Sequence, residues 1–274
     1  MAAGRLWVIA TPIGNLDDLS PRAAEVLRTV GLVAAEDTRH SAPLLARVGS
    51  NARMVALHEH NERDIAERIA ASVLAGENVA LIADAGTPLV SDPGFRVVRA
   101  VREAGGAVSP VPGPCAAIAA LSVAGLPSDR FVFEGFLPSK SAARRERMRA
   151  LASETRTLIF YESSHRIAES LADAVVEFGV AREAVLAREL TKLFETIIAA
   201  PLGEVLSRVE ADPNQQRGEF VLLVAGAGDD DADARLAEGK RVFALLREEL
   251  GPAKAAKLAA SITGAPRKAL YHVD

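Results

Sequence analysis

Short apolar segments alternate with longer amphipathic segments through the first half of the chain, and this alternation limits the possible folds more than any other feature. The apolar segments have the length of strands, and the segments between them have helical periodicity. The expected strands are residues 6–10, 32–35, 53–57, 79–83 and 107–111, and the expected helices are residues 20–30, 61–75, 93–105 and 115–124. A β-α-β-α order predicts a mostly parallel sheet with helices on both faces.

The second half of the chain has a different pattern, which begins after a linker-like stretch at residues 125–128. The expected strands are residues 131–136, 157–161, 184–188, 194–200 and 219–224, and the expected helices are residues 141–151 and 165–178. An acidic break at residues 226–231 precedes helical segments at 233–250, 252–261 and 266–271. We therefore expect an α/β fold with a parallel-sheet domain at 1–124, a mixed-sheet domain at 129–226 and a small helical extension at 229–274.

The composition indicates a folded protein. The chain has 274 residues, of which 49% are hydrophobic and 25% charged, so it can bury sizeable cores. Aromatic residues make up 4%, which argues against a platform of many stacked rings for single-stranded nucleic acid. The single cysteine, Cys115, cannot form an internal disulfide, and the sequence shows neither a signal peptide nor a membrane-spanning apolar run. We expect a soluble, cytoplasmic protein without membrane association.

Three rigid loops rich in small residues follow three of the expected strands in the first half. They lie at residues 11–18, 84–94 and 111–117. The carboxyl ends of parallel strands share one edge of the sheet, and open α/β sheets bind their ligands there. None of the three loops has the spacing of a P-loop or of a Gly-x-Gly-x-x-Gly fingerprint. Together they predict a preformed, backbone-lined pocket that suits an adenosine-bearing cofactor.

Polar clusters follow two other expected strands, at residues 36–40 and 58–62. Their histidine and carboxylate side chains are suited to proton transfer. His58 and His60 do not make a metal site by themselves, because no third ligand with suitable spacing accompanies them, and we expect no metal. Asn61 and Glu62 also fit an ordinary helix start, with an N-cap followed by an acidic first turn.

Two segments concentrate positive charge on a chain whose net charge is −4. Residues 140–149 contain five basic residues and one acidic residue, and residues 235–274 contain eight basic and four acidic residues. Such patches fit contacts with phosphate groups, although a solvated helix face has the same composition.

The loops and polar clusters belong to an ordered series of motifs between Leu6 and Tyr271. The motifs are TPIGNL at 11–16, AEDTR at 35–39, HEHNE at 58–62, the 84–94 loop, PGP at 112–114, GFLP at 135–138, FYESSHR at 160–166 and RELTK at 188–192. This series resembles the ribosomal RNA small-subunit methyltransferase I family, within the tetrapyrrole-methylase fold. The motifs at 36–39, 161–166 and 188–192 are similar to those of the ribosomal branch rather than the corrin branch.

The resemblance implies that S-adenosylmethionine is the methyl donor and is bound in a cleft between the two domains. It implies 2′-O-methylation of the ribose of cytidine 1402 in 16S rRNA of the small ribosomal subunit, by a homodimer. The cofactor-binding residues that it implies are Pro12, Gly14, Ala85, Gly86, Thr87, Val90, Ser91, Ala116, Ala117, Tyr161, Leu190, Glu219 and Val221. The predicted RNA-contacting residues are Arg39, Lys140, Arg144, Arg145, Arg166, Lys254, Arg267 and Lys268.

A ribose hydroxyl is a weak nucleophile and needs help in losing its proton. The candidate catalytic residues are Asp84, His58, Glu62, Asp37 and Lys192, and the sequence does not choose among them. Two other functions stay open: a methyltransferase of the same fold that acts on a tetrapyrrole or another small molecule, and a non-catalytic rRNA-binding assembly factor. The basic patches and the C-terminal extension argue against the first, and the intact strand-end loops argue against the second.

Overall fold

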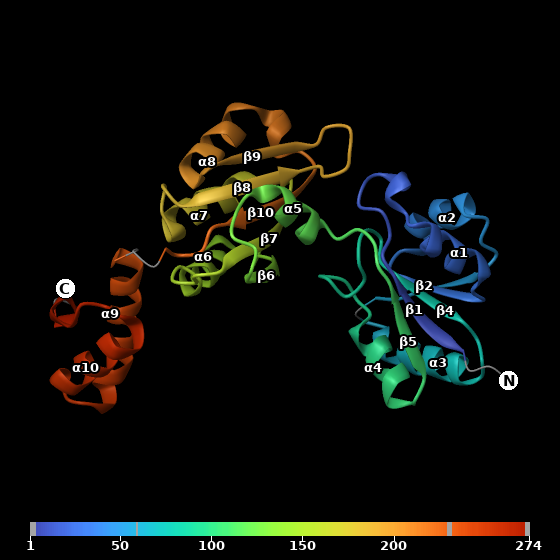
Figure 1. Ribbon diagram of the computed structural model, residues 1–274, viewed down its shortest axis with the longest axis horizontal. Helices are drawn as coiled ribbons and strands as arrows, with labels where there is room; N and C mark the ends of the chain where they lie inside the picture. Colours follow the sequence, from blue (N-terminus) through green and yellow to red (C-terminus); the bar gives the residue numbers. More distant parts are fainter. Residues whose placement is uncertain (1–3, 59, 229–231, 272–274) are drawn as a thin grey trace. The chain divides into compact units, whose positions relative to one another are not determined.

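The computed structural model describes residues 4–58, 60–228 and 232–271, with only the backbone described for 232–234. It divides the chain into two compact units. Unit 1 comprises Met1–Val123 together with Ala187–Thr196, and unit 2 comprises Ala124–Leu186 and Ile197–Asp274. Each unit is built around its own sheet (Figure 1).

Unit 1 contains the predicted parallel sheet. Its strands are β1 (Arg5–Ile9), β2 (Leu32–Ala35), β3 (Arg53–Ala56), β4 (Val79–Ile82) and β5 (Ala107–Val111). Their order across the sheet is β3-β2-β4-β1-β5, and every pairing is parallel. β4 and β5 therefore flank β1, and the loops that follow these three strands leave the same edge of the sheet.

Helices cover both faces of this sheet (Figure 1). On one face, α1 (Pro21–Thr29) and α2 (Thr38–Arg47) pack Leu27 and Leu45 against Ile9 and Val33. On the other face, α3 (Glu62–Leu74) and α4 (Phe95–Glu103) pack against alternate strand residues, such as Leu81. This alternation explains why the central strands are apolar on both sides. The short helix η1 (Leu16–Asp18) follows β1, and α5 (Ala116–Ala124) follows β5.

Unit 2 contains a mixed sheet with the order β6-β7-β10-β8-β9. Its strands are β6 (Phe131–Phe136), β7 (Thr157–Ser163), β8 (Glu183–Arg188), β9 (Thr196–Pro201) and β10 (Glu219–Val224). β7 is parallel to β6 and antiparallel to β10. The helices α6 (Ser141–Ala150), α7 (Ile167–Phe178) and α8 (Leu202–Ala211) contribute to one core with alternate strand residues, and η2 (Pro213–Gln216) leads into β10.

The C-terminal helices have a small core of their own. They are α9 (Ala232–Glu249), α10 (Pro252–Thr263) and η3 (Arg267–Tyr271). Phe243 and Leu270 are buried against alanines of α10, such as Ala256 and Ala259. A Cβ atom on Gly239 would lie 2.4 Å from that of Ala265, so these segments meet at small residues.

The sequence pattern does not predict α2 or α8. Pro43 lies inside α2, and a proline usually ends a helix. The helix α8 begins directly after β9, so no turn signal separates the two elements. The structure also differs from the predicted division at 129–226, because residues Ala187–Thr196 group with unit 1. The predicted extension at 229–274 begins at residues outside the described part of the chain.

No helix within the described ranges is long and apolar enough to cross a membrane.

Candidate functional site

Hydrogen bonds join the three loops at the carboxyl edge of the parallel sheet. Thr11 and Gly86 exchange two backbone hydrogen bonds, of 2.9 and 3.1 Å, and form an isolated antiparallel bridge. The hydroxyl of Thr87 donates to the carbonyl oxygen of Pro114 at 2.8 Å. Gly86 has a φ of 79°, and a Cβ atom on it would lie 3.3 Å from Cγ2 of Ile13. The loops therefore form one continuous wall made mainly of backbone.

The 84–94 loop contains several residues in the left-handed region of φ. Leu89 has a φ of 74°, Ser91 of 69° and Gly94 of 129°. For residues other than glycine this conformation costs roughly 1–3 kcal/mol each, and it persists only where the surroundings enforce it. The Leu89 side chain packs against the core of α3 and α4, which offsets part of this cost.

Residues Ala187–Thr196, which belong to unit 1 although they lie in the second half of the chain, also contain backbone in the left-handed region of φ. Glu189 has a φ of 51° and Thr191 of 67°. The ammonium group of Lys192 lies 2.8 Å from the carboxylate of Glu189. A Cβ atom on Gly14 would lie 2.4 Å from Cγ of Lys192, so the absence of a side chain at Gly14 leaves room for this lysine.

Three carboxylates interact at the ends of β2 and β4. The backbone N–H of Asp37 donates to Oδ1 of Asp84 at 2.9 Å, which ties the two strand ends together. Burial, followed by the negative charge of Asp84, raises the pKa of Glu36, and His58 opposes this effect. Burial raises the pKa of Asp92 to about 7, with smaller contributions from Glu36 and Asp84. We call Glu36, Asp84 and Asp92 the carboxylate group.

The predicted catalytic list contains Asp84 but omits Glu36 and Asp92. Glu36 directly follows a buried strand, and Asp92 lies in a loop already singled out for its rigidity. A signal for both was therefore present in the sequence. The interaction between them was not visible there, because 55 residues separate them in the chain.

Two other predicted catalytic residues have structural partners. Oε1 of Glu62 accepts the backbone N–H groups of Gly94 and Arg96, each at 2.9 Å. Asp37 caps α2 and lies 2.7 Å from a guanidinium nitrogen of Arg39, whose hydrogen bonds hold its pKa well below the usual range. His58 is exposed, and Glu59 in the same motif lies outside the described residues.

The predicted cofactor-binding residues fall into two sets. Leu190 of unit 1 lies in the strained 188–192 segment. The other residues of unit 1 lie on the three loops and at the start of α5, and they are Pro12, Gly14, Ala85, Gly86, Thr87, Val90, Ser91, Ala116 and Ala117. In unit 2, Tyr161 of β7 pairs in register with Val221 of β10, and Glu219 begins β10. The Tyr161 ring contacts Phe133 and Phe136 edge-on.

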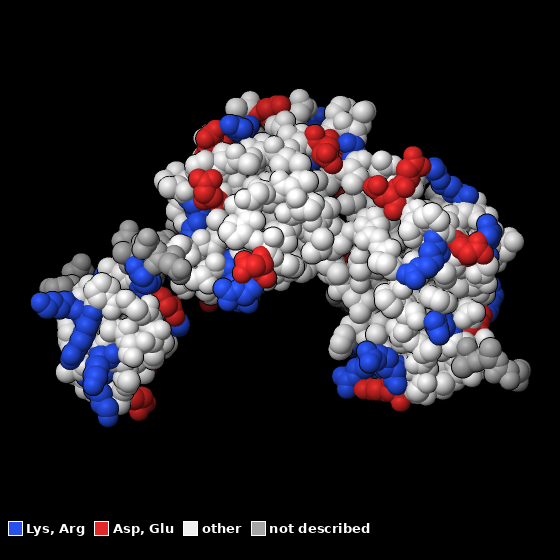
Figure 2. All heavy atoms as spheres, viewed as in Figure 1, with Lys and Arg blue, Asp and Glu red and all other residues white. Residues whose placement is uncertain are grey.

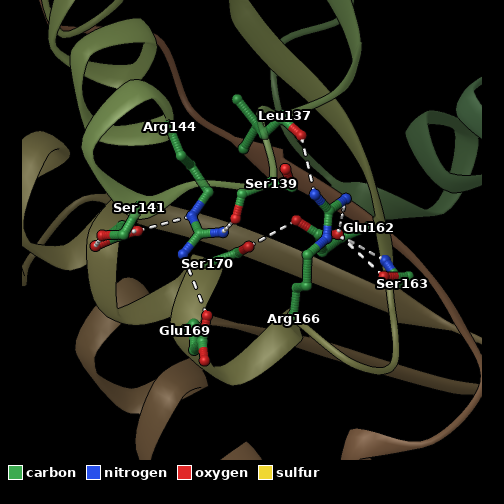
Figure 3. A network of polar contacts seen from close by, with 10 residues as sticks. Leu137, Ser139, Ser141, Arg144, Glu162, Ser163, Arg166, Glu169 and Ser170 are labelled. Atoms are coloured by element: carbon green, nitrogen blue, oxygen red, sulfur yellow. Dashed lines mark hydrogen bonds and ion pairs between the residues drawn. The ribbon is translucent and has the colours of Figure 1, made fainter.

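Arg144 is not available for RNA, contrary to the prediction. Its side chain is completely buried, and its guanidinium lies 2.7 Å from the carboxylate of Asp173. The same guanidinium lies 3.6 Å from Glu169 (Figure 3). Arg166 extends to Glu162, at 2.7 Å, and Glu162 is itself buried. Arg144 is therefore held inside unit 2 by ion pairs, and a count of charges along the sequence misjudges it.

The remaining arginines of α6 also have carboxylate partners. Arg145 and Arg149 share Glu177, and Arg147 pairs with Glu134. Glu177 and Glu134 are at least nine-tenths buried. The positive charge counted for residues 140–149 is therefore largely neutralised within unit 2, apart from the exposed Lys140.

The C-terminal helices present their basic side chains differently. Lys254, Lys257, Arg267 and Lys268 are exposed, and the face visible in Figure 2 shows more blue than red side chains over α9 and α10. Arg39 in unit 1 is also exposed, although it pairs with Asp37. Among the described residues, no cluster of three or more His, Cys, Asp or Glu could hold a metal ion.

Comparison with known proteins finds two family models. That of the tetrapyrrole (corrin/porphyrin) methylases matches residues 5–206, and that of the RsmI C-terminal HTH domain matches residues 229–273. The chain is 61% identical over 268 residues to the ribosomal RNA small subunit methyltransferase I of Xylella fastidiosa, covering 98% of both chains. It is 58% identical to the protein of that name from Pseudomonas aeruginosa, covering 99% of this chain and 96% of the relative.

A solved structure shows the same fold. The uroporphyrin-III C-methyltransferase of Thermus thermophilus, complexed with S-adenosyl homocysteine, matches with a TM-score of 0.55 and 18% identity. The match covers 81% of this chain and 97% of that one. At this identity the comparison establishes the fold alone.

Proposed function

Because the chain belongs to the ribosomal RNA small subunit methyltransferase I family, we propose that it methylates 16S rRNA with S-adenosylmethionine as the donor. The acceptor is the 2′-oxygen of the ribose of cytidine 1402. The observation that carries this proposal is the near-full-length similarity to curated methyltransferases of that name. Both family models support it, since together they match most of the chain.

The wall formed by the three loops fits this donor. Its glycines allow close approach of the ligand to backbone donors and acceptors, which suits an adenine and a ribose. The carboxylate group supplies negative charge on the same edge of the sheet, and the donor has a positively charged sulfonium and amino group. When bound, S-adenosylmethionine supplies an electrophilic methyl group and requires no metal.

The contacts within unit 1 narrow the choice of the proton acceptor. Oε1 of Glu62 already accepts the backbone N–H groups of Gly94 and Arg96. The hydrogen bonds and charge of Arg39 lower the pKa of Asp37, so this carboxylate is a weak base. The ammonium group of Lys192 lies in an ion pair with Glu189, and an ammonium group has no lone pair with which to accept a proton. These partners argue against Glu62, Asp37 and Lys192 as the proton acceptor.

We assign the proton transfer to the carboxylate group, with Asp92 as the acceptor and Asp84 beside it. A general base is most effective when its pKa lies near the working pH, and the pKa of Asp92 is raised to about 7. His58 is exposed and interacts with Glu36, which leaves it as the second candidate.

A methyl-transfer assay tests the function. Purified full-length protein with labelled donor is offered 30S subunits, protein-free 16S rRNA and a tetrapyrrole precursor. We expect label on the 2′-oxygen of one cytidine in 30S subunits. Label on the tetrapyrrole alone would favour a small-molecule enzyme. Binding to 30S subunits without donor binding, measured by calorimetry, would favour an assembly factor.

The C-terminal helices supply the RNA-contacting surface in this proposal. Lys254, Arg267 and Lys268 are exposed there, whereas Arg144, Arg145 and Arg166 have carboxylate partners in unit 2. Lys140 and Arg39 stay in the proposed set as exposed cations. The match to an HTH model over residues 229–273 supports this assignment.

The family resemblance also supports a homodimer that acts in the cytoplasm, where ribosomal subunits are its substrate. Sedimentation equilibrium of the full chain tests the oligomeric state, and a monomer at micromolar concentration would contradict the dimer.

A further inference from the structure

Glu62 is a buried carboxylate that no part of the proposed chemistry uses. It begins α3, and only 7% of its surface is exposed. One of its carboxylate oxygens, Oε1, accepts hydrogen bonds from the backbone N–H groups of Gly94 and Arg96. Its other oxygen lies 3.8 Å from Nε of Arg96.

These two N–H groups belong to the start of α4. The first N–H groups of a helix have no partner within the helix, and the helix dipole attracts a negative charge there. Gly94 precedes α4 without a side-chain cap of its own. Glu62 therefore caps α4 from a different helix, 32 residues earlier in the chain.

Gly94 is also the last residue of the 84–94 loop. A Cβ atom at Gly94 would lie 2.9 Å from Cδ2 of Leu81 and 3.3 Å from Cδ1 of Leu89, so the end of the loop is tightly packed. Leu89 and Ser91 hold strained backbone conformations just before it. Strained backbone conformations persist only where the surrounding structure enforces them, and the packing at Gly94 is part of that enforcement.

We propose that Glu62 is a positioning residue for the methyl donor: it fixes the end of the 84–94 loop and so holds the loop in its donor-binding shape. This inference rests on the proposed function, because it assigns the loop to the donor site. Thr11 holds the beginning of the loop through Gly86, and Glu62 holds its end. In this proposal the HEHNE motif at 58–62 affects donor binding because Glu62 fixes the backbone at the end of the 84–94 loop.

Two substitutions separate the geometry from the charge. Glu62→Ala removes the acceptor of both N–H groups. Glu62→Gln keeps an oxygen in place of Oε1, removes the charge and replaces Oε2 by an NH2 group. Asp64→Ala is the matched control, because Asp64 is the other acidic residue in the first turn of α3 and is exposed.

The experiment measures the Kd of S-adenosylmethionine and S-adenosyl homocysteine by calorimetry on the full chain, well below the melting temperature of each variant. We expect Glu62→Ala to weaken both ligands by about tenfold or more, since a charge-assisted acceptor is lost. Glu62→Gln should stay within about threefold of the parent protein, and Asp64→Ala should match it. In methyl transfer, the KM for the donor should rise more than kcat falls.

Hydrogen exchange supplies an independent measurement. Residues 84–94 should exchange faster in Glu62→Ala and regain protection at saturating donor. If Glu62→Ala does not fold, Glu62→Gln and the shortened Glu62→Asp still decide the matter, with Asp expected to be the weaker binder. A lowered melting temperature with unchanged Kd overturns the positioning role. Absence of donor binding by the parent protein would instead overturn the proposed function.

Discussion

Asp92 is a residue whose protonation the fold changes strongly. Its pKa rises from the ordinary 3.8 to about 7, mainly through burial. The folded state therefore holds this proton more tightly than the unfolded state does. The resulting stability is complete below about pH 4 and is lost as the pH rises through about 7.

The higher pKa of Asp92 in the folded state than in the unfolded state predicts opposite effects of Asp92→Asn on stability and activity. At pH 8 the variant should be more stable than the parent by on the order of 1–2 kcal/mol, after allowance for solvent screening. At pH 4 the two should be equally stable. Meanwhile kcat/KM should fall at least about tenfold at pH 8, and the parent's rise in kcat/KM near pH 7 should be absent. Urea unfolding at both pH values and a pH–rate profile check this. An unchanged profile would move the base to His58.

Gly14 and Lys192 form a second residue-scale test. Gly14→Ala should displace the Lys192 side chain, because the new Cβ atom would meet Cγ at 2.4 Å, and so break the ion pair with Glu189. We expect a loss of about 1–2 kcal/mol in the free energy of unfolding. In a Lys192→Ala background the loss should shrink by about 1 kcal/mol. Additive effects in this double-mutant cycle would contradict the contact.

At the scale of elements, α6 shows how a basic helix can be structural. Its arginines connect it to α7 through Asp173, Glu169 and Glu177, and to β6 through Glu134. In the same network, buried Glu162 accepts hydrogen bonds from the Ser163 N–H, at 2.8 Å, and from the Ser170 hydroxyl, at 2.6 Å (Figure 3). A helix with this composition is held by tertiary ion pairs.

Arg144→Leu tests this view of α6. Removal of one partner of a buried ion pair typically costs about 3–5 kcal/mol, because the other charge stays buried. We therefore expect a lower urea midpoint. Binding to 30S subunits, measured below the unfolding transition, should keep its affinity and salt dependence. A selective loss of subunit binding with normal stability would restore Arg144 to the RNA-contacting set.

At the scale of the whole molecule, the basic segment at 140–149 is largely paired with carboxylates, and the basic segment at 235–274 contains exposed lysines. The α6 arginines are paired within unit 2, whereas exposed lysines lie on α10 and η3. Contacts with phosphate make affinity fall with salt, by a slope of about one for each contact.

Deletion of the residues after Gly228 should therefore weaken 30S binding and flatten its salt dependence while sparing donor binding. The combined change Lys254→Ala, Lys257→Ala and Lys268→Ala should lower the slope by about 2–3. The matched control replaces Arg145, Arg147 and Arg149 by alanine and should leave the slope unchanged. Filter binding at salt concentrations from about 50 to about 200 mM measures the slope for both variants, because phosphate contacts change the affinity strongly over this range. An equal loss of slope in the control would contradict the assignment.

Much of the molecule follows from local patterns in the sequence. The strands β2, β5, β6 and β10 match their predicted bounds, because short apolar runs between turn residues leave little choice of conformation. The parallel sheet follows from the alternation of strands and helices, and the motif series identifies the family and its donor.

Only the tertiary structure decided which polar residues are free to act. Arg144 and Glu62 look like surface charges in the sequence, yet both are buried and occupied by partners 29 and 32 residues away. Asp92 acquires its raised pKa from burial and from Glu36 and Asp84, and residues Ala187–Thr196 join unit 1 across the chain. Periodicity and charge counts describe a residue's neighbours along the chain. Burial, ion pairing and protonation depend on neighbours in space, and only the folded chain brings these together.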